Sequence, residues 1–519
     1  MGEEKGAGMK QRLCIGIQER NAAWDAALNQ LGVWYEEVNY NLELHREYSV
    51  IILNKKPVKA QQSALKSFVE NDGRLLEIAD NLIFLEKSQT RSSHEDTLIN
   101  VDREGFLSHI SHVDVHTKVR LHKDGELLEG LVHLPAEDHS NLAFLGVDVA
   151  ELLQTTCYRR KRFFSRNGEH PDEIVSKVSK HELAEVLKAI LKELHFRRSL
   201  PFIEKWTSPT TKPVFCFRVD SDFGDKESMD DLYATIRKHQ KSATWFLHVE
   251  AHEDWLSHLK TYENQEIALH GYEHGTSDSF KKVNRNIQTG KEHLEKANID
   301  FNGFCAPYGI WNTALEKSLK NSGFEYTSEF TFCYDGLPLR PAEEKLPLQV
   351  PIHPICTGSL NRRKYSIEVM KGYFEDVLLN KLSRFEPALF YHHPLQPGLS
   401  VIDHLLELTD IHEFENLTFG EFAAFWKERE RFTFEAYLDD GKVTIEKSSN
   451  PDKLIQVSMN HSEFDLISTS EDIINLTKTT KLKFSKPYLP KPEEVLEMRK
   501  RDLNLLKTSL LDWKNRGRL

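Results

Sequence analysis

Short apolar runs alternate with helical repeats along the first third of the chain. Residues 24–31 and 61–69 carry apolar side chains at helical spacing, and a glycine follows each segment. Three apolar runs have the length and composition of buried strands: 13–17, 50–53 and 75–78. Strand–helix–strand order of this kind predicts a parallel α/β sheet. We therefore expect a first α/β domain over residues 1–200.

A Ser/Thr/Pro cluster at Thr207–Pro213 has the composition of a linker, and a second domain is expected over residues 214–430. After Arg431 the pattern changes to short alternating segments. Residues 433–438 and 443–446 flank Asp439-Asp440-Gly441-Lys442, which predicts a hairpin. We expect further strands near 454–459 and 480–484, and a terminal helix over 492–513 whose apolar stripe packs on its own domain. Residues 431–519 are therefore predicted to form a small β-rich domain with a C-terminal helix.

Composition narrows the class of protein. The 519 residues are 39% hydrophobic with a formal net charge of −12, which is typical of a globular protein and disfavours a general nucleic-acid binder. No segment approaches the ~20 unbroken apolar residues of a membrane helix. The first twenty residues are a poor secretory signal, and the six cysteines are scattered, as expected of reduced thiols. The sequence therefore predicts a cytoplasmic protein without membrane or nucleic-acid partners, and leaves its oligomeric state open.

Three charged residues alternate at the start of the second domain. The segment 215–224 is an apolar strand in which Arg218, Asp220 and Asp222 occupy every second position, so that their side chains are expected on one face. Buried charges of this kind need ionic partners or a metal. The alternative is a strand end whose two aspartates cap a turn.

Two histidines four residues apart follow the next apolar run, at His270 and His274. If the segment turns helical after His270, both imidazoles can bind one cation. A tight turn with Pro307 and Tyr308 follows at 303–309, and a buried-type strand at 389–394 ends in two histidines. The pair alone is a weak signal, but together with the earlier Asp-x-Asp strand it predicts a metal site.

The ordered set Asp-x-Asp, His-x-x-x-His, Pro-Tyr-Gly and a late strand ending in His resembles the polysaccharide deacetylase family of carbohydrate esterases. The resemblance covers residues 214–430 only. It implies a distorted (β/α) barrel with its site at the C-terminal ends of the strands. The element order of the first domain is similar to that of flavodoxin- and amidotransferase-like α/β domains. We see no nucleophile elbow there and expect that domain to be non-catalytic.

The resemblance implies a role for each motif residue. Asp222, His270 and His274 would hold a divalent metal, with zinc as the first choice and cobalt, nickel or iron as alternatives. Asp220 would be the general base. Such a ligand set leaves positions open for water and substrate.

A late histidine would be the general acid. His393 matches the motif better because it precedes Pro394, while His392 remains an alternative because adjacent strand residues face opposite sides. The resemblance implies that the backbone N–H of Tyr308, in the turn with Pro307, contributes to an oxyanion site. His353 could line the substrate groove or be a packed loop histidine.

One position departs from the family pattern. Cys305 stands where the third motif usually carries an arginine that pairs with the general base. Without a cationic neighbour the pKa of a buried carboxyl rises, so the base would be less ionised. Arg218, two residues before Asp220, is a candidate replacement, although it could pair with another acid.

These inferences predict an enzyme that hydrolyses a non-peptide carbon–nitrogen bond with a divalent metal. N-deacetylation of an acetylated amino sugar or polysaccharide is the first hypothesis. Another non-peptide amide on the same barrel is the second. A carbohydrate-binding or scaffold protein whose barrel has lost activity is the third, and Cys305 leaves room for it.

Overall fold

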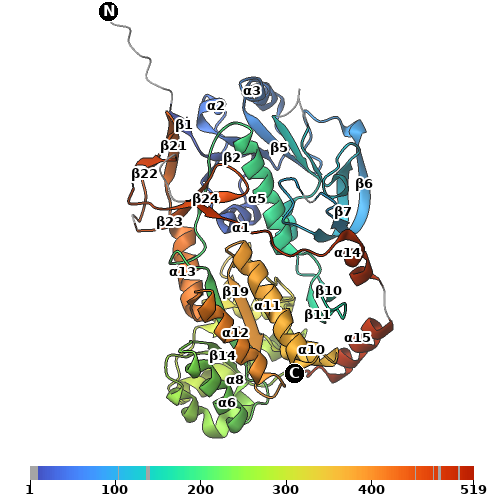
Figure 1. Ribbon diagram of the computed structural model, residues 1–519, viewed down its shortest axis with the longest axis vertical. Coiled ribbons are helices and arrows are strands. Elements are labelled where there is room, and N and C mark those ends of the chain that lie inside the picture. Colours follow the sequence, from blue (N-terminus) through green and yellow to red (C-terminus); the bar gives the residue numbers. More distant parts are fainter. Residues whose placement is uncertain are drawn as a thin grey trace, which may run out of the picture. The chain divides into compact units, whose positions relative to one another are not determined.

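The computed structural model divides the chain into two compact units (Figure 1). Unit 1 contains Met1–Leu153, Glu182–Pro209 and Glu428–Ser485, and unit 2 contains Gln154–His181, Thr210–Lys427 and Lys486–Leu519. The structure describes residues 10–102, 104–135, 141–450, 452–471, 473–476, 481–500 and 503–519. Within these ranges no helix combines the length and apolar composition that a membrane span requires.

A parallel half-barrel sheet forms the centre of unit 2. Its strands run in the order β18-β17-β16-β15-β14-β13-β19, with β20 also paired to β13, and every pairing is parallel. The strands are β13 (Val214–Asp220), β14 (Thr244–Leu247), β15 (Glu266–Leu269), β16 (Gly303–Phe304), β17 (Tyr326–Thr327), β18 (Leu348–Gln349), β19 (Ala388–His392) and β20 (Glu415–Asn416). The α/β prediction is confirmed here, with an open ladder between β18 and β19 among the described strands in place of a closed barrel.

Helices connect these strands and cover the sheet, because parallel strands need crossover segments. All seven residues of β13 are buried. In Figure 1, α6 packs beside α12, and α12 beside α11. The helices are α6 (Lys226–Lys238), α7 (Val249–His252), α8 (Phe280–Lys296), α9 (Thr313–Leu319), α10 (Thr357–Arg362), α11 (Ile367–Ser383), α12 (Leu399–Ile411) and α13 (Phe419–Arg431).

Aromatic side chains form much of the core beneath this sheet. Phe419, Phe422 and Trp426 recur at helical spacing on α13 and are fully buried. The Phe419 ring meets the Phe246 ring of β14 edge-on, with 6.1 Å between centroids. This packing fixes the sheet while leaving the C-terminal ends of its strands available for polar residues.

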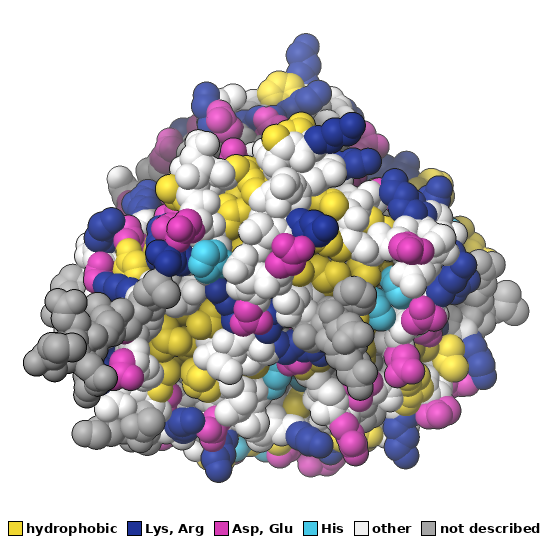
Figure 2. Space-filling view, turned by 90° about the horizontal axis from the view of Figure 1, so that it is seen from above, with side chains coloured by type: hydrophobic (Ala, Val, Ile, Leu, Met, Phe, Trp, Pro, Cys, Tyr) yellow, Lys and Arg dark blue, Asp and Glu magenta, His cyan; other side chains and the backbone are white. Residues whose placement is uncertain are grey.

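Unit 1 contains a six-stranded sheet of order β3-β2-β4-β5-β9-β8, parallel except for β8. Its strands are β2 (Ile15–Ile17), β3 (Tyr35–Glu37), β4 (Val50–Leu53), β5 (Arg74–Ile78), β8 (Val132–His133) and β9 (Leu142–Leu145). The accompanying elements are α1 (Ala22–Leu31), α2 (Leu44–Glu47), α3 (Lys59–Glu70), α4 (Val149–Leu153), most of α5 (Lys180–Phe196) and the hairpin β6 (Thr90–Ile99)–β7 (His112–His122). On the face around α2 and α3, acidic and basic side chains are interspersed (Figure 2).

The C-terminal β-strands belong to unit 1, whereas the sequence suggested a separate domain over 431–519. The expected hairpin forms as β21 (Glu435–Asp439) and β22 (Lys442–Glu446), with left-handed backbone at Asp440 and Gly441. Strand β21 pairs with β1 (Gln11–Arg12), and β23 (Leu454–Ser458) pairs with β12 (Phe202–Lys205). Two four-stranded sheets result, completed by β24 (Glu463–Ser468), β25 (Ile473–Asn475) and β26 (Lys481–Lys483). Pairing partners hundreds of residues apart therefore set the boundaries.

The terminal segment forms two helices in unit 2, α14 (Pro492–Arg499) and α15 (Leu503–Asn515). The hairpin β10 (Tyr158–Arg162)–β11 (Asp172–Ser176) also lies in this unit. The expectation that the apolar stripe packs on its own domain is wrong for its described side chains. Leu496, Leu506, Leu510 and Trp513 are each more than half exposed. Helix α14 buries Val495 and Met498 instead of Leu496, and α15 directs Ser509 and Asp512 toward Arg160.

The aromatic core predicts a large stability difference between two phenylalanines of unit 2. Phe422→Ala should lower the free energy of unfolding by about 3–5 kcal/mol, since it empties a fully buried site. Phe280→Ala, at a side chain that is 46% exposed, should cost much less. Denaturant titration followed by tryptophan fluorescence would measure both. Equal losses would contradict this account of the core.

Candidate active site

The end of β13 supplies the first charged residues of the site. Arg218 and Asp220 lie on the strand, whereas Asp222 follows it with a left-handed backbone at φ +43°. A non-glycine residue with positive φ is uncommon and needs support from its surroundings. The three charges therefore do not share one strand face as expected, because the chain turns before Asp222.

Two histidines that the sequence interpretation missed hold this turn. His248 donates its backbone N–H to Ser221 Oγ at 2.9 Å, and its Nδ1 lies 2.8 Å from the Asp222 carbonyl oxygen. His252 Nε2 lies 2.8 Å from the same hydroxyl. Burial lowers the pKa of both imidazoles to about 4. His248 is thus neutral and able to donate from Nδ1. Their spacing of four after β14 repeats that of His270 and His274 and was a usable signal.

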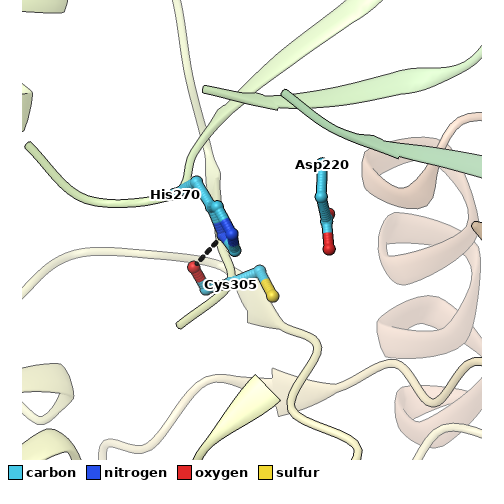
Figure 3. A group of neighbouring side chains, drawn as sticks. All are labelled: Asp220, His270 and Cys305. Atoms are coloured by element: carbon cyan, nitrogen blue, oxygen red, sulfur yellow. Dashed lines mark hydrogen bonds between the residues drawn. The ribbon is translucent and has the colours of Figure 1, made fainter. Parts of the chain in front are cut away.

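Asp222, His270 and His274 come together, as the metal-site hypothesis requires. Asp222 Oδ1 lies 3.4 Å from His270 Nε2 and 3.1 Å from His274 Nε2. His270 Nδ1 lies 2.8 Å from the Cys305 carbonyl oxygen, which can only accept (Figure 3). The proton of a neutral His270 ring is therefore on Nδ1, and its Nε2 lone pair faces the carboxylate.

This arrangement fits a divalent cation. Burial alone would raise the pKa of the Asp222 carboxyl, but the charge of His393 holds it well below its usual range. Asp222 Oδ1 is buried and has no conventional hydrogen-bond donor among the described residues. A carboxylate and imidazole lone pairs directed at one point repel each other unless a cation lies between them. One carboxylate and two imidazoles are a ligand set found for zinc and related metals.

A second group of metal-ligand types, Asp220, His270 and Cys305, lies beside the first (Figure 3). It fits a cation less well, because the Arg218 guanidinium already contacts both the Asp220 carboxylate and the Cys305 thiol. Burial also raises the pKa of Cys305 well above its usual value, so the thiol is neutral. The group with Asp222 is therefore the better candidate for a metal.

Arg218 pairs with Asp220, in the arrangement that the sequence interpretation considered as a replacement for the missing arginine. Its Nε and Nη2 lie 2.5 and 2.6 Å from the two carboxylate oxygens, and Nη1 donates to the Ser328 carbonyl at 2.7 Å. Burial alone would raise the pKa of Asp220, but the guanidinium lowers it. Asp220 is therefore ionised, and each oxygen keeps a further lone pair.

The two adjacent histidines at the end of β19 face different surroundings. His392 is buried with Nδ1 3.0 Å from Thr357 Oγ1, and burial lowers its pKa to about 3. His393 lines the cavity, with Nε2 3.6 Å from Asp222 Oδ2 and 4.0 Å from Asp220 Oδ2. Burial opposes its protonation, but the Asp222 charge raises its pKa to about 10. Of these two histidines, His393 is the one that lines the cavity and whose pKa is raised.

The remaining candidates divide between the cavity and the core. Tyr308 lines the cavity with a backbone φ of +60°, and its ring centroid lies 4.8 Å from that of His274. Pro307 and His353 are not among the residues that line it. His353 is instead buried between Asp335, 3.2 Å from Nδ1, and the Tyr373 hydroxyl, 3.0 Å from Nε2. His353 is therefore a packed loop histidine and does not line the substrate groove.

One cavity of about 400 Å³ contains the site. Residues from separate parts of unit 2 line it: Glu173, Ile174, Asp220, Asp222, His270, His274, Tyr308, Gly309, Phe330, Cys356, Gly358, Ser359, Arg362, Tyr391, His393, Gln396, Asp512 and Arg516. Several come from the β10–β11 hairpin, α10 and α15, which no motif marks. Cys356 is one of them, and although burial would raise its pKa, His393 lowers it to about 7.

Residues 209–327 match the polysaccharide deacetylase family. The resemblance drawn from the first three motifs is thereby confirmed for this segment, and it supports a hydrolase. His393 lies outside the matched residues.

Solved structures of this family are also similar to the central part of the chain. A protein of Mycobacterium smegmatis, provisionally named a polysaccharide deacetylase, is 16% identical over 44% of this chain and 94% of its own, with a TM-score of 0.38. A peptidoglycan deacetylase of Bacillus subtilis is 14% identical over 43% and 95%, with a TM-score of 0.31. A CE4 family pseudoenzyme of Bacillus anthracis is 16% identical over 42% and 69%, with a TM-score of 0.31. No curated protein matches the chain.

If Asp222, His270 and His274 hold a metal such as zinc, removal of any one of them should weaken its binding. Asp222→Ala and His274→Ala should each weaken zinc binding by more than about 100-fold, since they delete a ligand atom. Cys305→Ser should leave the affinity near that of the unaltered protein, because Cys305 belongs only to the group that contacts Arg218. Competition with a chromophoric chelator would measure each affinity. Strong dependence on Cys305 would move the metal to the other group.

Proposed function

We propose that this protein is a metal-dependent hydrolase of a non-peptide amide, acting as an N-deacetylase of an acetylated amino sugar or polysaccharide. The observation that carries the proposal is the presence of Asp222, His270 and His274 in one cavity with the ionised Asp220 and the protonated His393. A divalent metal, with zinc as the first choice, would be held by the first three and would lower the pKa of a water and polarise the amide carbonyl.

Asp220 is proposed as the general base. Its carboxylate is ionised because Arg218 pairs with both oxygens, and the remaining lone pairs can accept a proton from the attacking water. The same pairing also lowers the affinity of the Asp220 carboxylate for a proton. Arg218 therefore keeps Asp220 ionised but makes it a weaker base. We propose that Arg218 positions and tunes the base in place of the family's third-motif arginine.

His393 is proposed as the general acid. Amide hydrolysis expels an amine that is too basic to leave without a proton, and His393 carries one at neutral pH. Its Nε2 faces both aspartates, which holds the ring toward the centre of the cavity. The backbone N–H of Tyr308 is proposed to stabilise the oxyanion, as the family resemblance implies.

We also propose that the enzyme acts in the cytoplasm on a precursor. All six cysteines are free thiols, and Cys157 is exposed, which fits a reducing compartment. Alkylation of the cysteines during isolation, followed by mass spectrometry, would support this location if all six thiols were found reduced.

Acetate release from N-acetylated amino sugars, with and without added zinc or cobalt, tests the reaction. Asp220→Asn and His393→Ala should lower kcat by about 10²–10⁴-fold with zinc still bound, since each removes a proton-transfer group. His392→Asn is the matched control and should keep most activity, because His392 faces Thr357. Zinc binding without hydrolysis of any amide would favour a carbohydrate-binding or scaffold protein without activity. Hydrolysis of other non-peptide amides, but not of acetylated amino sugars, would show that the substrate is of a different class.

The role of Arg218 predicts a loss and a rescue. Arg218→Met should lower kcat by about 10–100-fold while zinc binding persists, because the base loses its cation. Adding Cys305→Arg to that variant should recover activity, since the Cys305 thiol contacts the Arg218 guanidinium and lies at the same carboxylate. Unchanged turnover of Arg218→Met would discard this role.

A further inference from the structure

The last residues of unit 2 contribute to the same cavity as the proposed metal ligands. Asp512 and Arg516, on and just after α15, line it together with Asp222 and His274. The segment is fixed in place by backbone hydrogen bonds. Gly517 donates its N–H to the Tyr308 hydroxyl at 2.8 Å, and its carbonyl accepts from Thr276 at 3.1 Å. The segment after α15 is therefore a wall of the site.

Most charges at this wall are already paired. Arg160 contacts Asp512 and also pairs with Asp172, with Nη1 2.5 Å from Oδ1. Arg362 Nη2 lies 2.9 Å from Glu173 Oε2, and its Nη1 lies 3.8 Å from Asp512 Oδ1. The acids near the cavity mouth are thus neutralised by the arginines that hold the wall together.

Arg516 differs from these arginines. Its guanidinium carbon lies 5.7 Å from the centre of the Tyr308 ring, whose other neighbours include the His274 ring. Its Nε is buried without a hydrogen-bond partner, and no carboxylate forms an ion pair with it among the residues that the structure describes. Arg516 is half-buried and lines the cavity, so a ligand that offers an anionic acceptor to its guanidinium would be stabilised by charge-assisted hydrogen bonds.

We propose that Arg516 binds an anionic group of the substrate, a carboxylate or a phosphate. The guanidinium donates paired hydrogen bonds in a planar arrangement that matches both groups. One aromatic ring, that of Tyr308, separates it from the metal-ligand candidate His274. The inference rests on the proposed function, and it narrows the substrate to an acetylated amino sugar that carries an acidic substituent near the amide.

Binding of three probes to the zinc-loaded Asp220→Asn variant tests this subsite without turnover. The probes are N-acetylglucosamine, which is neutral, N-acetylmuramic acid, which carries a carboxylate, and N-acetylglucosamine 1-phosphate. At least one anionic probe should bind about 10- to 100-fold more tightly than the neutral one by calorimetry, as expected for a charge-assisted hydrogen bond. The preferred anionic probe identifies the acidic group.

Substitutions of the wall separate the subsite from general electrostatics. Arg516→Met should abolish the preference and leave the affinity for the neutral probe unchanged, while Arg516→Lys should retain part of it. Lys514→Met removes an equal charge from an exposed position near the end of α15, two residues before Arg516, and should change nothing. Equal affinity for all probes, no measurable binding, or an equal effect of Lys514→Met would overturn the inference.

Acetate release by the protein with Asp220 intact is a separate measurement. If no probe is hydrolysed but Arg516 still determines the preference for an anion, the subsite stands and the proposed deacetylation fails. If hydrolysis occurs without that preference, only the inference about Arg516 fails.

Discussion

Two carboxylates two residues apart, at the buried end of one strand, are the constraint on which the site depends. Asp220 and Asp222 repel each other and both lose solvation, so each needs a positive partner. Arg218 supplies it for Asp220 through two hydrogen bonds. Asp222 faces the protonated His393 and two imidazole nitrogens, a set that a divalent cation would complete. The different partners give the two aspartates different chemistry.

The backbone turn after β13 makes this division possible. On a regular strand, residues two apart share a face, and both aspartates would compete for Arg218. The left-handed conformation of Asp222 directs it instead to the histidines that follow β15. The cost of that conformation is offset by the hydrogen bonds from His248 and His252 around Ser221. These two histidines are therefore part of the site although they do not line the cavity.

Local spacing allowed the motifs of the central domain and the β21–β22 hairpin to be predicted, but not the domain boundaries. Asp220 and Asp222 lie at the C-terminal end of β13, and His270 and His274 follow β15, with β14 between these two parallel strands, so short local patterns marked both parts of the site. The domain boundaries depend on long-range strand pairing, such as β1 with β21, which leaves no local signal. Arg516 likewise reaches the cavity from the segment just after α15, nearly three hundred residues beyond Asp220 in the sequence. No spacing rule connects such positions, because only the folded chain brings them together.

Arg218 and Cys305 together replace the arginine that the family's third motif usually carries: Arg218 supplies the positive charge, and Cys305 stands at the motif position. The thiol contacts the guanidinium, so the two side chains occupy neighbouring parts of one buried space beside Asp220. Two arginines there would crowd each other and place two positive charges against one carboxylate, whereas none would leave a buried base uncompensated. One arginine beside Asp220 is therefore both required and sufficient to balance the charge of its carboxylate. Because a strand neighbour reaches the carboxylate as directly as a loop residue would, the departure from the family pattern preserves the charge balance around Asp220.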